Sequence, residues 1–128
     1  MVPIMWLAAL LAGGVHVLAF CMESLWWTTP RVRARFGQSL EQVNATRLLA
    51  FNQGFYNLFL AVGTFAGFAL VLTGHGRVGF TLVSWNCLSM LGAAIVLAVS
   101  APRMRRGAAI QGAAPLVFLL LAAARWAA

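Results

Sequence analysis

Charged residues are scarce in this chain of 128 residues, and lysine and aspartate are absent. Charged side chains make up 9% of the sequence, where an average soluble domain has roughly 25%, and hydrophobic side chains make up 62%. A soluble protein of this length has too small an interior to bury so much apolar surface. The composition therefore excludes the soluble classes and predicts an integral membrane protein.

Acidic residues are limited to Glu23 and Glu41, so the nine arginines give a net charge of +7. This charge does not indicate nucleic acid, because the arginines fall between apolar runs, where they set topology and contact anionic headgroups. We expect membrane lipids as partners and no nucleic acid. The first apolar run is too long for a cleavable signal and lacks a charged start, so we interpret it as a span.

Signatures of catalysis and of cofactor binding are also missing. The chain has no P-loop, no GxGxxG, no HExxH, and no serine or cysteine in a nucleophile setting. Cys21 and Cys87 lie inside apolar runs and are expected to pack as small apolar side chains. His16, Glu23 and His75 are too few and too scattered for a zinc or iron site. We therefore predict neither a metal nor a cofactor.

Four apolar runs, each near the ~20 residues that cross a bilayer core, predict four spans. They cover about residues 3–27, 45–73, 78–100 and 107–126 of a single domain, residues 1–128. The expected fold is all-α, a compact four-helix transmembrane bundle. Small-residue pairs, Gly63 with Gly67 and Ala108 with Gly112, favour close helix packing and are compatible with a homodimer.

Arginine placement predicts the orientation of this bundle. Seven of the nine arginines flank the first or the third connection, namely Arg31, Arg33, Arg35, Arg47, Arg103, Arg105 and Arg106. Because positive charge accumulates on the cytoplasmic side, we expect these connections in the cytoplasm and both termini outside. Tryptophans near span ends are typical interfacial anchors: Trp6, Trp26, Trp27 and Trp126.

The long polar stretch between the first two spans, residues 31–46, is expected to form a short interfacial helix. Ser39 would be its N-cap, with Gln42 three residues later in capping-box spacing. Thr28, Thr29 and Pro30 are expected to end the first span, because proline disfavours a helical residue before it.

Glu23 and His16 are ionisable residues inside the first predicted span. Seven residues are nearly two helical turns, so the two side chains are expected on one face, roughly 10 Å apart along the axis. Ionisable groups in lipid are costly and tend to face a protein interior or a wet cavity. Both residues are therefore candidates for a functional site.

Polar residues of the second span are expected at similar depth: Asn52, Gln53, Tyr56 and Asn57. Gln111 of the fourth span lies as deep as Glu23, while Asn86 of the third span lies nearer the outer half. Together with aromatic residues they predict a mostly apolar pocket for a lipophilic ligand with one polar end. The aromatic candidates are Phe20, Trp27, Phe51, Phe55 and Trp85.

Structural roles compete with this interpretation. Asparagine, glutamine and serine in spans often form interhelical hydrogen bonds worth ~0.6 kcal/mol on average. Glu23 could instead reach the interface and pair with Arg47 or Arg31. His16 could be a neutral histidine whose ring is satisfied by an asparagine or a tyrosine.

Two stretches of the chain resemble motifs of a family of small bacterial membrane proteins, known only as a domain of unknown function with four predicted spans. Met22-Glu23-Ser24-Leu25-Trp26-Trp27-Thr28-Thr29-Pro30-Arg31, within residues 16–33, is similar to LEMFLWTTPRGR, with slight departures at residues 21–25 and 32. Residues 50–61 resemble ANQGxYNxFLA. The resemblance implies the architecture, the bacterial inner membrane, and the importance of His16, Glu23, Trp27, Pro30, Asn52, Gln53, Tyr56 and Asn57. It supplies no activity.

We therefore expect a polar intramembrane site between spans one and two that binds a lipophilic small molecule. Its binding residues are predicted as Trp27, Asn52, Gln53, Tyr56, Asn57 and Asn86. In an enzymatic version, an isomerase or a cyclase, Glu23 acts as general acid and His16 as base or electrostatic stabiliser, since burial favours the neutral forms of both. The alternatives are a small proton-coupled multidrug-type transporter and an accessory subunit of a larger membrane complex.

Overall fold

The structure, a computed structural model, describes residues 2–127 and contains helices but no strand over that range. The elements are α1 (Val2–Phe20), the π-helical turn η1 (Cys21–Leu25), α2 (Pro30–Phe36), α3 (Leu40–Leu72), α4 (Gly76–Ser100), the 3-10 turn η2 (Pro102–Met104) and α5 (Arg105–Ala127). Four segments are long and apolar enough to cross a membrane, namely Val2–Leu25, Leu40–Leu72, Gly76–Ser100 and Pro102–Arg125. The expectation of an all-α bundle with four spans is confirmed.

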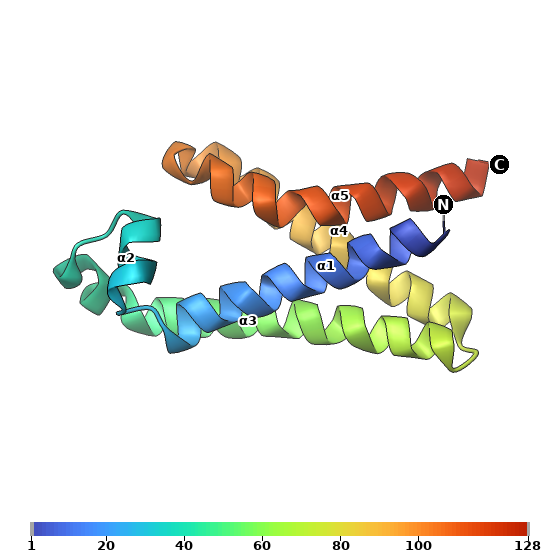
Figure 1. Cartoon of the computed structure of the whole chain (residues 1–128), viewed down its shortest axis with the longest axis horizontal. Coiled ribbons are helices and arrows are strands. Elements are labelled where there is room, and N and C mark those ends of the chain that lie inside the picture. Colours follow the sequence, from blue (N-terminus) through green and yellow to red (C-terminus); the bar gives the residue numbers. More distant parts are fainter. Residues whose placement is uncertain (1, 128) are drawn as a thin grey trace.

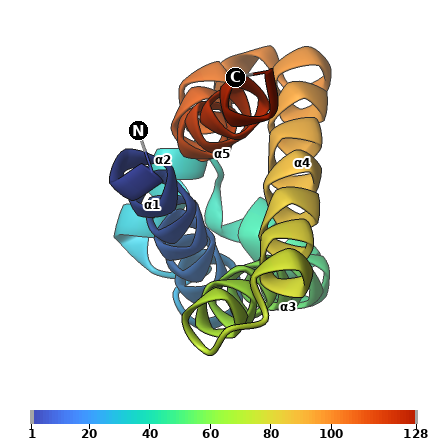
Figure 2. The same cartoon turned by 90° about the vertical axis from the view of Figure 1, so that its right-hand side faces the viewer.

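The helices α1 and α4 cross between α3 and α5 (Figure 1). The first half of α1 packs on α5, where Met5 and Phe118 share one buried cluster, and η1 at its end packs on α3. Conversely, α4 begins against α3, where Gly79 faces Gly67, and ends against α5. Seen along the bundle, α1 and α4 occupy opposite sides, with α3 and α5 between them (Figure 2).

Both small-residue pairs of the sequence are used within the chain. A Cβ on Gly63 or on Gly67 would collide with side chains of α4, and a Cβ on Gly112 would come within 2.9 Å of Ala94. Ala108 is buried as well. Such small residues let helices approach closely. The homodimer stays a prediction. Because these pairs pack against helices of the same chain, they are not free to form a dimer interface.

One end of the bundle, here called the arginine-rich end, carries α2 and the connection between α4 and α5 (Figure 1). The seven arginines of the first and third connections therefore lie at one end, and α1 begins and α5 finishes at the other. Which end faces the cytoplasm stays a prediction. Among the expected tryptophan anchors, Trp6 packs against Phe68 and Phe118, and the side chain of Trp126 lies outside the described residues.

The first connection differs in detail from the expected interfacial helix. Pro30 does not border the first span; it is the first residue of α2, which ends at Phe36 and is capped by Gly37 with a left-handed φ of 63°. The predicted capping box is confirmed, since Ser39 accepts from the Gln42 N–H and Gln42 accepts from the Ser39 N–H. It starts α3 itself, so the second span begins at Leu40, five residues before the expected position.

The first span ends in a π-helical turn. The Trp26 N–H donates to the Cys21 carbonyl at 2.9 Å, five residues back, where an α-helix would use the residue four back. The wider turn changes the direction of every side chain after Phe20. Glu23 therefore lies on this turn, outside the regular helix α1 that carries His16.

Candidate functional site

Glu23 lies on η1, where its carboxylate faces the middle of α3. Its Oε2 accepts a 2.7 Å hydrogen bond from the Asn57 side-chain amide. Asn57 is only 7% exposed, and the same amide nitrogen lies 3.3 Å from the Gln53 carbonyl oxygen. The acid is thus bound to α3, and the expected alternative of pairing with Arg47 or Arg31 is not the arrangement seen in the described residues.

Ser24, the next residue, holds η1 against α3. Its hydroxyl donates a 2.8 Å hydrogen bond to the Phe51 carbonyl. Gly54 makes this approach possible, because a Cβ there would collide with the Ser24 hydroxyl and lie 3.0 Å from the Ser24 nitrogen. Neither Ser24 nor Gly54 was among the predicted site residues. The one available signal was a glycine inside the polar run Asn52-Gln53-Gly54, since a glycine in a span often marks close helix approach.

Trp27 fixes the chain just beyond the turn. Its indole N–H donates to the Val43 carbonyl at 3.2 Å, and its ring packs on Phe36 of α2 with the centroids 5.0 Å apart. These contacts tie α2 and the start of α3 to the end of the first span. Trp27 therefore stands beside Glu23 at a defined position and forms a wall of the site.

Side-chain hydrogen bonds between helices concentrate at this place. Apart from Arg105, which bonds the Ala98 carbonyl at the connection of α4 and α5, the described residues form three such bonds. All three join η1 and the residue Trp27 to α3. In contrast, Ser84, Asn86 and Ser89 each donate to the carbonyl four residues earlier in their own helix. The polar groups of α4 thus do not act as interhelical hydrogen-bond donors.

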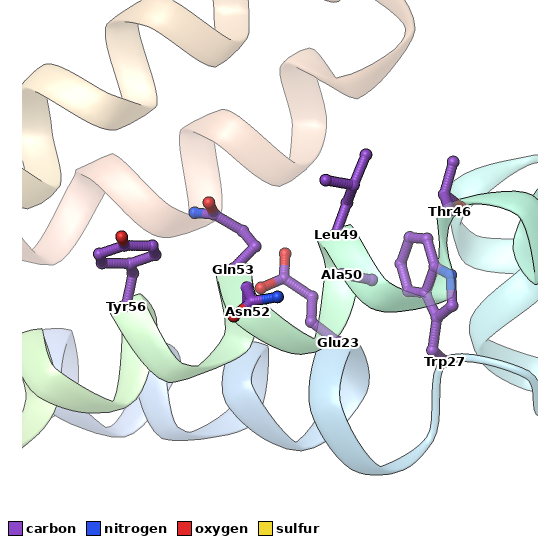
Figure 3. A pocket seen from close by; sticks show the side chains of 8 residues that line it. All are labelled: Glu23, Trp27, Thr46, Leu49, Ala50, Asn52, Gln53 and Tyr56. Carbon is purple, nitrogen blue, oxygen red and sulfur yellow. The ribbon is translucent and has the colours of Figure 1, made fainter.

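A hollow of about 470 Å³, here called the inner groove, lies along the face of α3 next to Glu23. Its lining residues are Glu23, Trp27, Thr46, Leu49, Ala50, Asn52, Gln53 and Tyr56. The carboxyl of Glu23 projects to the same side of α3 as the side chains of Gln53 and Tyr56 (Figure 3). Tyr56 is 65% exposed, so the groove is open and its polar groups are accessible. Four of the predicted binding residues therefore meet there: Trp27, Asn52, Gln53 and Tyr56.

His16 is outside the inner groove. It is 1% exposed in the interior of the bundle, and its Nδ1 lies 2.9 Å from the Ala12 carbonyl of its own helix. That contact makes Nδ1 the protonated nitrogen, so Nε2 is an acceptor. Nε2 is buried without a hydrogen-bond partner among the described residues. Sequence spacing placed His16 with Glu23, but of these two residues only Glu23 lines the groove.

Asn86 and Trp85 of α4 also lie elsewhere. Asn86 is 7% exposed and faces Gly63 at the contact of α3 and α4, while its amide bonds the Leu82 carbonyl. Trp85 is exposed and lines a different hollow beside Arg77. Neither residue contributes to the inner groove, which belongs to the end of the first span and to α3.

The chain matches a family described as a protein of unknown function (DUF1304), over residues 10–123. This match covers most of the chain and includes every residue that lines the inner groove. No curated protein and no solved structure matches the chain.

Proposed function

This chain belongs to the DUF1304 family, whose function is unknown, and we propose that it binds a lipophilic small molecule in the inner groove. The polar end of the molecule lies at Glu23, Gln53 and Tyr56, and its apolar body lies along Leu49 and the lipid-facing surface of α3. A groove with a mostly apolar wall and a few convergent polar groups suits such a ligand.

The hydrogen bonding of Glu23 is the observation that carries the proposal. The Asn57 amide donates to Oε2, and Oε1 has no hydrogen-bond partner among the described residues. A carboxyl group in a membrane span is costly, so its cost must be offset by an interaction. A hydroxyl or carbonyl group of a ligand supplies that interaction, with the carboxyl accepting from a hydroxyl or donating, when protonated, to a carbonyl.

Acid catalysis is a further step for the same site. Glu23 lines the groove and is the group that would deliver a proton to a bound alkene, epoxide or carbonyl. His16 does not line it, so the two residues do not form an acid and base pair around one ligand. The binding role is therefore the proposal, and an isomerase or cyclase would need a base other than His16.

The test is native mass spectrometry of the protein extracted in a mild detergent, with analysis of the lipophilic molecules that co-purify. We expect one stoichiometric species in the wild type, reduced about tenfold in Glu23→Ala by the loss of a hydrogen bond to a carboxylate. Gln53→Ala should reduce it by a smaller factor, about fivefold, because a hydrogen bond between neutral groups contributes less. The matched control is Asn86→Ala, which removes an equally polar side chain outside the groove and should retain the ligand.

Two outcomes would contradict the proposal. Equal retention in the groove variants and in the control would place the ligand elsewhere. Recovery of bulk phospholipid alone, in every variant, would instead favour the alternatives of transport or of a structural role in a larger complex.

A further inference from the structure

A second hollow, here called the outer furrow, lies on the other side of Glu23 and Trp27. It measures about 420 Å³ and is shaped by the end of the first span on one side and by α3 on the other. Beyond the two shared residues, it is lined by Ser24, Leu25, Thr28, Asn44, Arg47, Leu48 and Phe51. None of these seven residues lines the inner groove.

The furrow is graded from polar to apolar along α3. Four lining residues form one stripe on the surface of α3, because each is three or four residues from the next one along the stripe. They are Asn44, Arg47, Leu48 and Phe51, with Arg47 and Leu48 side by side in the middle. The polar members are nearer the arginine-rich end, and the apolar members lie deeper in the span. Leu48 is 72% exposed and Phe51 is 45% exposed, so the apolar part of the stripe is open to lipid.

The polar end of the furrow has donors without acceptors. The Arg47 guanidinium, the Asn44 amide and the Thr28 hydroxyl donate no hydrogen bond to another side chain or carbonyl among residues 2–127. Glu23, the one acid of the furrow, is already hydrogen-bonded to Asn57. Arginine presents a fork of N–H groups that matches the oxygens of a phosphate. The furrow therefore offers a site for an anion at its polar end and for a hydrocarbon chain below it.

We propose that the outer furrow binds an anionic phospholipid of the leaflet at the arginine-rich end, with its phosphate at Arg47, Asn44 and Thr28 and an acyl chain along Leu48 and Phe51. Charge complementarity supports this occupant, because seven of the nine arginines lie at this end of the bundle and attract anionic lipid. The proposal does not rest on the function of the inner groove, since only Glu23 and Trp27 belong to both hollows.

The hollow at Arg77 is a natural comparison. It has a similar volume, about 480 Å³, and also combines an arginine with a tryptophan, Trp85. However, its lining residues, between Arg77 and Trp85, come from α4 alone. It lacks a second wall, so it should attract anionic lipid only through charge. Arg77→Gln is therefore a control for Arg47→Gln that removes the same charge.

The experiment is a titration of the detergent-solubilised protein with phosphatidylglycerol or with phosphatidylcholine of the same chains, read by native mass spectrometry. We expect the wild type to prefer phosphatidylglycerol, and Arg47→Gln to bind its first phosphatidylglycerol about tenfold more weakly, by the loss of a charge-assisted hydrogen bond. Arg77→Gln should leave that first binding step unchanged. The uncharged variant Asn44→Leu/Thr28→Val should also weaken it, which separates a built site from net charge.

Three results would overturn the proposal. The first is equal affinity of the wild type for the two lipids, and the second is an equal loss of phosphatidylglycerol affinity in Arg47→Gln and Arg77→Gln. The third is displacement of the lipid by millimolar inorganic phosphate, which would identify a site for free phosphate. Gln53→Ala, which alters only the inner groove, should keep phosphatidylglycerol binding. The proposals for the two hollows can therefore fail independently. A thermal melt of each variant confirms that it is folded.

Discussion

The side-chain amide of Asn57 donates a 2.7 Å hydrogen bond to Glu23 and so joins the middle of α3 to the π-helical turn at the end of the first span. We expect the two residues to be coupled in stability. Interhelical hydrogen bonds in membrane proteins average ~0.6 kcal/mol and reach ~1.7 kcal/mol, and a bond between a carboxylate and the buried amide of Asn57 should lie near the upper value. A double-mutant cycle of Glu23→Ala and Asn57→Ala, read by unfolding in mixed micelles, measures the coupling.

The matched cycle pairs Glu23→Ala with Asn86→Ala. Asn86 bonds only its own helix, so the coupling in this second cycle should be close to zero. A coupling as large as that of the first cycle would mean that the Glu23 to Asn57 contact is not the cause.

Gly54 should tolerate no larger side chain. A Cβ there would collide with Ser24 and push η1 away from α3, and such overpacking typically costs about 1–3 kcal/mol. Gly54→Ala should therefore lower the free energy of unfolding by this amount. Gly14→Ala is the control, because its Cβ would meet no atom within 4 Å and alanine is the better helix former. The hypothesis fails if both variants have the same stability.

His16 should contribute little to the stability of the bundle. Its Nδ1 bonds its own helix and its Nε2 has no partner in the described part of the chain, so an apolar side chain of similar size removes an unsatisfied acceptor. We expect His16→Leu to unfold at the same or a higher temperature than the wild type. A loss above ~1 kcal/mol would indicate a buried water bound to Nε2.

Orientation can be tested with single cysteines. In a background with Cys21 and Cys87 replaced by alanine, Ala34→Cys lies in α2 at the arginine-rich end, and Gly76→Cys lies at the opposite end. The charge bias predicts that an impermeant maleimide added to intact bacterial cells labels residue 76 and not residue 34. Labelling of both residues in a single population would indicate mixed insertion, as in the alternative of a dual-orientation transporter.

Local features of the chain could be predicted from the sequence. The four spans follow from the length of apolar runs, and the capping box of Ser39 and Gln42 follows from a spacing of three residues. Even here the second span begins earlier than expected, because Glu41, Gln42 and Asn44 lower the hydropathy without breaking the helix. Hydropathy reports where lipid starts, whereas the helix itself extends beyond it.

The arrangement of the site could be predicted only in part. Asn52, Gln53, Tyr56, Trp27 and Glu23 meet as expected, because they lie at one depth on neighbouring spans. His16 is not among them, because it is buried in the interior of the bundle on α1. Glu23 lies on a π-helical turn of five residues, which are too few for periodicity to reveal. Likewise, Asn86 faces Gly63 because of how α4 crosses α3, and contacts between distant segments set that crossing.

The crossing of α1 and α4 also has a mechanical consequence. The packing partners change along the bundle: α4 meets α3 where it begins and α5 where it ends, and α1 adds α5 as a partner toward its start while Trp6 there still contacts Phe68 of α3. When a helix tilts about the point where it crosses its neighbours, its two ends move in opposite directions. A molecule bound beside Glu23 that tilts α1 would thus displace Met5 against Phe118, roughly 30 Å away along the helix axis. Binding near one face of the membrane would then alter the packing near the other face.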